Sequence, residues 1–548
     1  MLDIYKKSGY NIYNYKRQWG QLMSFTYELN VGKYRYVYEA TSYRNEKGDS
    51  RNKAVIIGKV DQNTGQRIYK DDYIDRMKKA GITIENPNDS KLFSVDDIKK
   101  STIREYGMIY LLQELAERDG LLGALNEAFP YDSNELFTLA CYLVSSGEPF
   151  QYCEDWVRNT ECPPVGTLSS QRISELLGRI EQDGRDRFYQ LWCACRYERE
   201  YLALDITSTS SYSELIDDVA WGHNRDGEKL PQVNICMLMG EESRLPVYQT
   251  VYDGSLNDVK TLNKTITSFG FITEGRDLLA VMDKGFYSGA NISGMMDATP
   301  RVQFVVSMPL TAKLTKTLIE SARDEIDDID NVIVIGDDSL RGVSSEIEWA
   351  NEKIYAHVYY SAKKASRVRE ELYVHVALLR DGAIAEPHKY VESAEHKKYL
   401  RFTKTKLGYS IKIRREVLDK ELSYSGWVVI LSNKLANASK TIGIYRDKDV
   451  VEKGFERFKN SLDMGRLRVH SEYRMQNKLF VGFIALIQMS EINCIMTKTA
   501  LYRKMTMRQL VLTLSKLRVQ YIKGTRVLFP LTKTQREIFE IFDVAIPK

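Results

Sequence analysis

The sequence has few cysteines and histidines for its length, and none of them stands at the spacing of a metal site. Its seven cysteines include no paired CxxC spacing, and its six histidines show no ligand spacing. A zinc site is therefore not expected. The odd number of cysteines, in a sequence without a recognisable signal peptide, favours reduced thiols and a cytoplasmic location.

Long hydrophobic runs and a strong net charge are also missing. The most apolar segment, Leu479–Met489 (LFVGFIALIQM), is too short to span a bilayer, so we expect a buried core helix and no membrane partner. The net charge of +4 is too small to indicate nucleic-acid binding by itself. Basic residues are nevertheless concentrated in residues 1–60 and in Arg401–Arg415, which has no acidic residue. Both segments fit a solvated surface as well as a DNA contact.

The first two hundred residues divide into two patterns. Residues 1–90 alternate Tyr and Val with polar residues, as in YELNVGKYRYVYEATSYR, which predicts a small β-rich N-terminal domain with a possible DNA contact. Residues 91–199 change to helical spacing, as in YGMIYLLQELAERDGLLGALNEAF. We expect an all-helical module there, used for DNA binding or for dimerisation.

Strand signals return at residue 201 in close order. Three apolar runs, YLALDI, VNICMLMG and LPVYQTVYDG, are separated by turn-prone segments and predict an antiparallel meander. A helical segment (DVKTLNKTITSFGF) and the strands LLAVMD and RVQFVVSMP follow. This order predicts an α/β, ribonuclease-H-like catalytic core whose first part covers residues 200–310.

The remaining helix of such a core is expected only after a long interruption. Residues 311–441 are too many for a loop and contain strand-like runs such as IEWANEKIYAHVYYS, ELYVHVALL and SYSGWVVILSN, so we expect a mostly β insertion. The second part of the core is then assigned to residues 442–500, which include a Glu-bearing helix. Residues 501–548 are expected to form a C-terminal helical region.

Three carboxylates stand at positions that suggest a shared site. Asp205 and Asp283 each end an apolar strand, which is where α/β sheets place their ligands. In the stretch YRDKDVVEKGFERFK, helical geometry places Tyr445, Lys448, Glu452 and Lys459 within roughly 60° of one another.

An apolar stripe on the same helix would seat it on a core. Val451, Phe455, Phe458 and Leu462 follow one another at helical spacing beside the charged face. Taken alone, the charged face fits a solvated helix, and each aspartate fits a turn cap. Together, the three carboxylates are suited to hold a pair of Mg²⁺ ions.

The motifs resemble those of DDE transposases of the IS4 group, and more closely its IS1634-like branch, over roughly Tyr201 to Glu540. The IS4 pattern Y-x2-R-x3-E-x6-K falls on Tyr445, Lys448, Glu452 and Lys459, and the D-x-G-F/Y motif begins at Asp283. The first aspartate of the family resembles Asp205, with the family-like segments LPQVN and YDGSLNDVKTL after it. Lysine replaces the family arginine at position 448. The planar guanidinium group, which can donate hydrogen bonds to two phosphate oxygens at once, is therefore missing at this position.

The resemblance implies an insertion-sequence transposase that binds the terminal inverted repeats of its element and moves it by cut-and-paste transposition. Asp205, Asp283 and Glu452 would be catalytic and would hold two Mg²⁺ ions, with Mn²⁺ as a substitute. Water would first free a 3′-hydroxyl, which then attacks the opposite strand or the target DNA. The active form would be a homodimer on double-stranded DNA.

The resemblance also implies DNA contacts. Tyr445, Lys448 and Lys459 would hold backbone phosphates near the cut. Trp427 is either a core residue, which its strand-like surroundings favour, or a stacking surface for an unpaired base.

Two other classes of protein remain open. A host-adopted DNA-binding protein would keep the fold without cutting activity, and a ribonuclease-H-like nuclease would cut without strand transfer. Metal-dependent cleavage of an element end, followed or not by joining to target DNA, separates the three.

Overall fold

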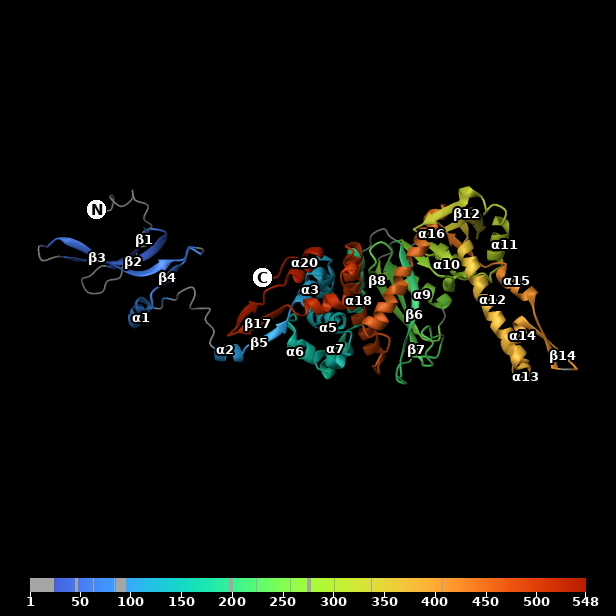
Figure 1. Ribbon diagram of the computed structural model, residues 1–548, viewed down its shortest axis with the longest axis horizontal. Coiled ribbons are helices and arrows are strands. Elements are labelled where there is room, and N and C mark those ends of the chain that lie inside the picture. Colours follow the sequence, from blue (N-terminus) through green and yellow to red (C-terminus); the bar gives the residue numbers. More distant parts are fainter. Residues whose placement is uncertain are drawn as a thin grey trace. The chain divides into compact units, whose positions relative to one another are not determined.

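The computed structural model describes residues 24–44, 48–62, 64–82, 84, 95–196, 201–222, 224–256, 258–273, 277–299, 301–336, 338–406 and 408–548. The chain divides into two compact units, Met1–Thr102 with Gln520–Val527, and Ile103–Val519 with Leu528–Lys548. Figure 1 labels the elements of both. Residues 1–23 and 85–94, which include parts of the expected N-terminal domain, lie outside the described residues.

The first unit contains a four-stranded antiparallel sheet with the order β1-β2-β3-β4. Its elements are β1 (Ser24–Val31), β2 (Tyr34–Arg44), β3 (Ser50–Val60), β4 (Arg67–Tyr69), α1 (Asp71–Lys79) and α2 (Val95–Lys99). Val37, Ile57 and Val60 are buried together with Tyr73 of α1. This small apolar cluster is the core of the sheet.

The second unit is mixed α/β and is built on a nine-stranded sheet with the order β11-β12-β13-β16-β10-β9-β6-β7-β8. Only β9 runs parallel to both of its neighbours, β6 and β10. The strands are β6 (Leu202–Ser210), β7 (Gln232–Gly240), β8 (Pro246–Asp253), β9 (Leu278–Met282), β10 (Val302–Ser307), β11 (Val332–Ile335), β12 (Asp338–Trp349), β13 (Glu352–Tyr360) and β16 (Trp427–Ser432). Strands β6 and β7 are buried almost throughout, because their runs of apolar residues are covered on both faces.

The helical layer upstream of β6 packs on a helix from near the end of the chain. In Figure 1 the red helix α18 (Glu472–Lys498) lies beside the cyan helices α5 and α7, and it contacts both. The upstream elements are β5 (Thr102–Glu105), α3 (Gly107–Arg118), α4 (Leu121–Ala128), α5 (Ser133–Ser146), η3 (Phe150–Tyr152), α6 (Cys153–Asn159), α7 (Ser170–Arg179) and α8 (Gln182–Arg196). The segment expected to be all helical therefore also contains a strand, β5.

Helix α18 is longer than the sequence pattern indicates. It has 27 residues and is long and apolar enough to cross a membrane by length and composition alone, so the expectation of a segment too short to span is wrong. The apolar run Leu479–Met489 is only its middle, because polar residues continue the helix at both ends. Within the structure, 89% of its most apolar window is buried, as in the core helix of a folded domain.

A buried carboxyl group on α18 gives the fold a pH-dependent stability. Burial raises the pKa of Glu491 to about 9, and Asp119 adds to this, while Arg118, whose Nη2 lies 2.7 Å from Oε1, acts against it. Between the ordinary glutamate pKa of about 4.5 and about 9, the folded state therefore binds more protons than the unfolded state. The stability that this proton contributes is present below pH 4.5 and is lost as the pH rises towards 9.

We expect Glu491→Gln to remove this pH dependence. Thermal unfolding followed by circular dichroism should show the melting temperature of the wild type falling by several degrees between pH 5 and pH 9, and the variant should lose most of this decrease. Glu540→Gln, at an exposed position, is the matched control and should behave as the wild type. Equal pH profiles for all three proteins would contradict the prediction.

The insertion is mixed, so the prediction of a mostly β segment between residues 311 and 441 is wrong. The run ELYVHVALL, read as a strand, lies within the 24-residue helix α12 (Ala362–Ala385), where Leu372, Val376 and Leu379 recur on one face. Four strands of the insertion do join the large sheet. Its other elements are α11 (Lys313–Ala322), η5 (Ile329–Asn331), α13 (Pro387–Tyr390), α14 (Ala394–Tyr399), β14 (Leu400–Thr405), β15 (Gly408–Ile413) and α15 (Arg415–Leu422).

The remaining elements lie between the strands of the large sheet or follow its last strand in the chain. The C-terminal region was expected to be helical but also contains two strands, because Arg518–Leu528 is rich in Val, Ile and Tyr around a Lys523–Gly524 turn. The elements are α9 (Asp258–Ile272), η4 (Lys284–Phe286), α10 (Gly289–Asp297), α16 (Ala438–Asp447), α17 (Asp449–Glu456), η6 (Arg457–Ser461), η7 (Leu501–Arg503), α19 (Met507–Leu514), β17 (Arg518–Ile522), β18 (Thr525–Leu528) and α20 (Lys533–Ile541).

Candidate active site

Asp205 and Asp283 stand side by side on neighbouring strands. Strands β6 and β9 run parallel, and their last paired residues are Leu204 and Met282. The residue after each of these is one of the two aspartates. Neighbouring strands lie ~4.8 Å apart. Asp283 directly follows the last residue of β9, as the sequence predicts.

Asp205 does not end its strand, which corrects the sequence interpretation. It is the fourth residue of β6, and the strand continues to Ser210 because Thr207–Ser210 still pairs with β7. The pairing with β9 does stop at Leu204. Asp205 therefore faces the space beyond the end of β9, although its own strand continues.

The motif from Tyr445 to Lys459 is not one continuous helix. Tyr445 belongs to α16, Lys448 forms the junction, Glu452 lies on α17, and Lys459 lies in the π-helical turn η6. The backbone of Lys448 stays in the helical region, with φ −56° and ψ −18°. Asp283 accepts a 2.9 Å hydrogen bond from the Tyr445 hydroxyl.

The apolar stripe of the motif is buried as predicted. Val451, Phe455, Phe458 and Leu462 are all at most 6% exposed. Helix α17 packs against β6 and β7, and Gly454 allows this close approach, because a Cβ atom there would lie 2.3 Å from Sδ of Met239. The stripe thus fixes α17 beside the strand that carries Asp205.

Lys448 lies among the three carboxylates. Its Nζ donates a 2.9 Å hydrogen bond to Oε1 of Glu452, and the charges of Asp283, Glu452 and Asp205 all act on it. Only 13% of its side chain is exposed, whereas the Glu452 side chain is 54% exposed. Lys448 is therefore a common counter-ion for the cluster.

The pKa directions reflect this arrangement. Burial raises the pKa of Asp205, against the opposing charges of Arg225 and Lys448. Burial also acts to raise the pKa of Asp283, but Lys448, the Lys284 N–H and the Tyr445 hydroxyl outweigh it, and the pKa lies below its ordinary value. Burial lowers the pKa of Lys448 less than the carboxylates raise it, so Lys448 remains an ammonium ion.

The connection between β6 and β7 supplies site residues that the sequence interpretation missed. Arg225 donates a 3.2 Å hydrogen bond from Nη1 to Oδ1 of Asp205. The backbone N–H of Arg225 donates a second hydrogen bond to Oγ of Ser208. Asp226 accepts two hydrogen bonds from Nζ of Lys459, at 2.6 and 2.9 Å. The segment GHNRDGEK shows only turn propensity, and no local signal indicates that it folds back along β6.

The donor chemistry of the cluster fits a hard divalent cation, because carboxylate oxygens are the ligands that Mg²⁺ prefers. Within the described ranges, however, no three His, Cys, Asp or Glu side chains are already gathered to hold a metal ion. Glu452 is hydrogen-bonded to Lys448 instead, on an exposed part of α17. A three-carboxylate metal site thus requires Glu452 to exchange this partner for the cation.

Trp427 lies in the core rather than at the cluster. It is 7% exposed, its ring centroid is 5.0 Å from that of Tyr360, and the Arg323 guanidinium lies 5.4 Å from its ring. A stacking surface for a base needs an exposed ring face. Trp427 therefore occupies a core position, the alternative that its strand-like surroundings favour, and presents little ring surface to a base.

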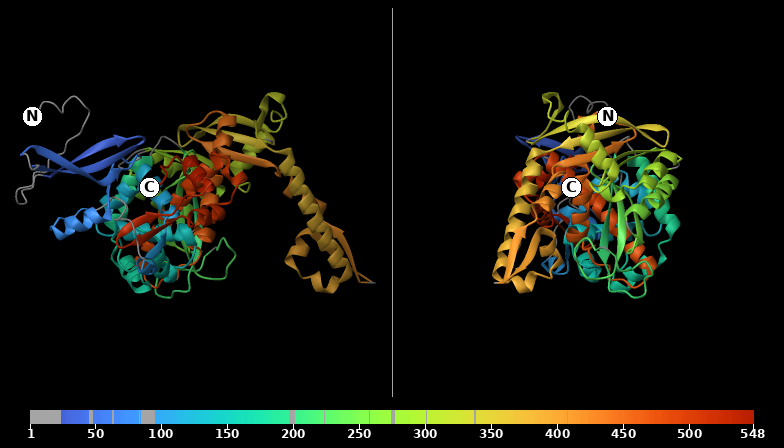
Figure 2. Two further views of the ribbon diagram at one scale, coloured as in Figure 1. Left: turned by 60° about the vertical axis from the view of Figure 1, so that its left-hand side comes forward. Right: turned by 90° about the vertical axis from the view of Figure 1, so that its right-hand side faces the viewer.

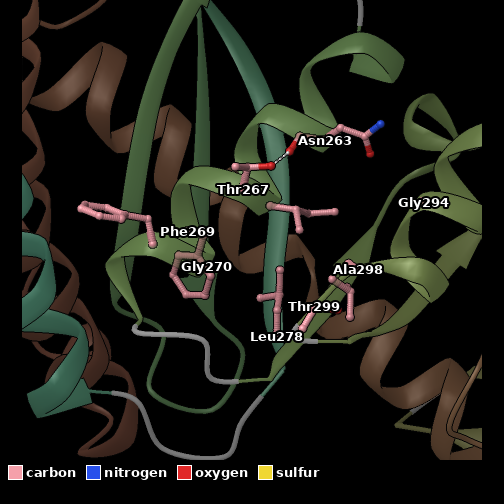
Figure 3. Close-up of a pocket in the computed structure, with 11 residues that line it drawn as sticks. Asn263, Thr267, Phe269, Gly270, Leu278, Gly294, Ala298 and Thr299 are labelled. Atoms are coloured by element: carbon pink, nitrogen blue, oxygen red, sulfur yellow. Dashed lines mark hydrogen bonds between the residues drawn. The ribbon is translucent and has the colours of Figure 1, made fainter.

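A pocket of about 420 Å³ lies away from the cluster, between α9 and α10 (Figure 3). Its wall includes Leu278 and Val302, the first residues of β9 and β10. Asp283 follows the opposite end of β9. The pocket is lined mainly by apolar and small polar residues and carries no carboxylate, so we do not assign it to the site.

Comparison with known proteins gives the family. The chain matches the model of the transposase DDE domain over residues 196–488, more than half of its length. No curated protein matches it. A solved structure, the piggyBac transposase synaptic complex with hairpin DNA, is 10% identical, with 73% of this chain and 70% of that chain covered and a TM-score of 0.34. On the family match, which includes the Asp205, Asp283 and Glu452 cluster, the protein belongs to the DDE transposases.

Proposed function

We propose that the protein is an insertion-sequence transposase of the IS4 group, closest to its IS1634-like branch, that cuts at the ends of its element and joins them to target DNA. The observation that carries the proposal is the meeting of Asp205 and Asp283 with the Tyr445, Lys448 and Glu452 motif. The strand order β8-β7-β6-β9-β10, with only β9 parallel to both neighbours, supports a ribonuclease-H-like core.

The side chains of the cluster have distinct roles in this proposal. Asp205, Asp283 and Glu452 would hold two Mg²⁺ ions, or Mn²⁺ as a substitute, and such ions stabilise charge on the attacking and leaving oxygens of a phosphodiester. Tyr445 orients Asp283 through its hydroxyl, and burial together with the Asp283 charge raises the pKa of Tyr445, so it remains a donor. Lys448 supplies positive charge next to the reacting phosphate.

The rest of the chain would position DNA and a second subunit. We assign residues 1–90 to a β-rich domain with a possible DNA contact, 91–199 to a DNA-binding or dimerisation module, and 200–310 with 442–500 to the catalytic core. The insertion spans 311–441, and 501–548 form the C-terminal region. The partners would be terminal inverted repeats, target DNA and a second copy of the chain, in a bacterial or archaeal cytoplasm.

Cleavage of DNA that carries the inverted repeats flanking the gene tests the proposal. The wild type should nick this duplex at the element end only when Mg²⁺ or Mn²⁺ is present, and should then join the 3′ end to a second duplex. Nicking without joining would favour a nuclease. Binding without nicking in either metal would favour a host-adopted DNA-binding protein.

The Lys459–Asp226 ion pair gives a second expectation. Lys459 is only 11% exposed, and its Nζ donates a hydrogen bond to the Asp226 carboxylate. In this proposal the carboxylate occupies the position that a DNA phosphate would take. Asp226→Asn should therefore tighten DNA binding several-fold, whereas Lys459→Ala should weaken it and flatten the salt dependence by about 0.9 units of slope.

Fluorescence anisotropy with a labelled duplex in Ca²⁺, at several salt concentrations, measures both effects. Asp217→Asn is the matched control, because this exposed residue of the same connection undergoes the same change of charge. An equal gain in affinity for Asp217→Asn and Asp226→Asn would show that net charge alone is responsible.

A further inference from the structure

The arm of the insertion, residues 362–422, has a small core of its own. Helix α12 packs with α13, α14, α15 and β15, and Val376, Tyr399 and Leu418 form an apolar cluster separate from the main core. In Figure 2 the hairpin β14–β15 lies at the far end of α12. With 24 residues at 1.5 Å each, α12 is about 36 Å long.

The two faces of the hairpin differ in chemistry. Because partners in register share a face, Leu400, Phe402, Ile411 and Ile413, which are buried or half-buried, lie on one side, and the exposed Lys404 and its partner Tyr409 continue this face towards the tip. The opposite face carries only hydrogen-bond donors and small residues. Its members are Arg401, Thr403, Thr405, Gly408, Ser410 and Lys412.

The three lysines of this hairpin do not stabilise its fold through ion pairs with the described residues. Arg401 stands directly opposite Lys412, and like charges in this position destabilise a strand pair. Glu416 lies 3.4 Å from both Arg401 and Arg414, but Lys404, Lys406 and Lys412 form no ion pair with any residue in the described part of the chain. The repulsion therefore lowers the stability of a hairpin that depends on its contacts with α12 and α14.

A basic cleft extends from the root of the arm to Tyr445 of the catalytic motif. The cleft has a volume of about 420 Å³, and its wall includes Tyr445 and four cations, Arg446, Lys363, Lys364 and Arg367. Arg446 and Lys363 share one carboxylate, that of Asp338, at 3.4 and 3.9 Å. Excess positive charge is thus present next to Tyr445, which belongs to the catalytic motif, and again on the hairpin.

We propose that the hairpin β14–β15 binds the sugar–phosphate backbone of duplex DNA at a distance from the cut. The DNA would pass along the basic cleft between the hairpin and the catalytic motif. Lysine, arginine, threonine and serine are the side chains that contact DNA phosphates, and such contacts position the duplex without reading its sequence. The length of α12 corresponds to about ten base pairs at 3.4 Å each. This inference deepens the proposed function, on which it rests, by assigning a second DNA-holding surface.

Binding of mixed-sequence DNA tests the inference. The probes are duplexes of about 8 and about 50 base pairs, because at 3.4 Å per base pair the shorter one is shorter than α12 and cannot reach both surfaces. The triple variant Lys404→Gln/Lys406→Gln/Lys412→Gln should bind the longer duplex roughly 10- to 100-fold more weakly at moderate salt, with a salt slope smaller by up to about 2.7 units. The loss on the shorter duplex should be much smaller.

The control variant Lys353→Gln/Lys389→Gln/Lys397→Gln removes the same charge from lysines that are already paired with glutamates. It should stay within about threefold of the wild type, because paired exposed lysines add little to phosphate binding. Circular dichroism and thermal unfolding verify that both variants are folded. Equal binding of the longer duplex by the two triple variants would overturn the inference.

Nicking of the element-end duplex separates this inference from the proposed function. If the wild type nicks in Mg²⁺ and the hairpin variant binds as the control does, only the hairpin assignment fails. If the wild type does not nick, the proposed function fails, while a selective loss of binding in the hairpin variant would still establish the hairpin as a DNA contact.

Discussion

Glu452→Ala is expected to reduce strand cleavage by more than about 10³-fold, since a catalytic metal contributes several kcal/mol of transition-state stabilisation. Binding to the element-end duplex should be unchanged or slightly tighter, because a negative charge next to phosphate is removed. The Glu452 side chain is 54% exposed and has no part in the apolar stripe, so folding should not be affected.

Two assays on one duplex check this expectation, with affinity measured in Ca²⁺ and nicking in Mg²⁺ or Mn²⁺. Glu456→Ala is the matched control, because Glu456 is an exposed glutamate one turn further along the same helix. It should cut at nearly the wild-type rate. If Glu452→Ala also cuts at that rate, the catalytic assignment fails and a DNA-binding function without cleavage takes its place.

Lys448→Ala is expected to destabilise the metal-free protein and to strengthen its response to Mg²⁺. Removing the ammonium group leaves Asp205 and Asp283, both largely buried, without their common counter-ion, which costs on the order of 2 kcal/mol. A bound divalent cation would replace that charge. The melting temperature should therefore fall without metal, and added Mg²⁺ should raise it more than in the wild type.

Differential scanning calorimetry over a range of Mg²⁺ concentrations measures both changes. Lys448→Arg should restore most of the lost stability, because it returns the positive charge. Lys453→Ala is the control, since Lys453 forms an exposed ion pair with Asp449 on the same helix and should contribute less than about 0.5 kcal/mol. A wild-type melting profile for Lys448→Ala, with and without Mg²⁺, would contradict the role of Lys448 as counter-ion.

The parts of the site that depend on local periodicity could be predicted from the sequence. The stripe of Val451, Phe455 and Phe458 follows from helical spacing, and all three side chains are buried. The position of Asp283 follows from the buried run before it. Both signals are local, because burial of one face imposes a period on neighbouring residues.

The missed features depend on contacts between distant residues. Asp226 and Lys459 are 233 positions apart, and an ion pair between them leaves no periodic trace in either segment. Arg225 approaches Asp205 only because the β6–β7 connection folds back along its own strand. ELYVHVALL was assigned to the wrong element because a short apolar run fits a strand and a helix equally well.

The position of β16 sets the order in which the large sheet can form. This strand lies between β10 and β13, yet it is the last of the nine in the chain. About 120 residues separate β10 from β16, which takes roughly 6–24 s to synthesise. During that time β10 has an unpaired edge that can associate with other chains. A shortened protein that lacked β16 would keep this edge of β10 unpaired, so the insertion is needed to cover that edge of the catalytic sheet.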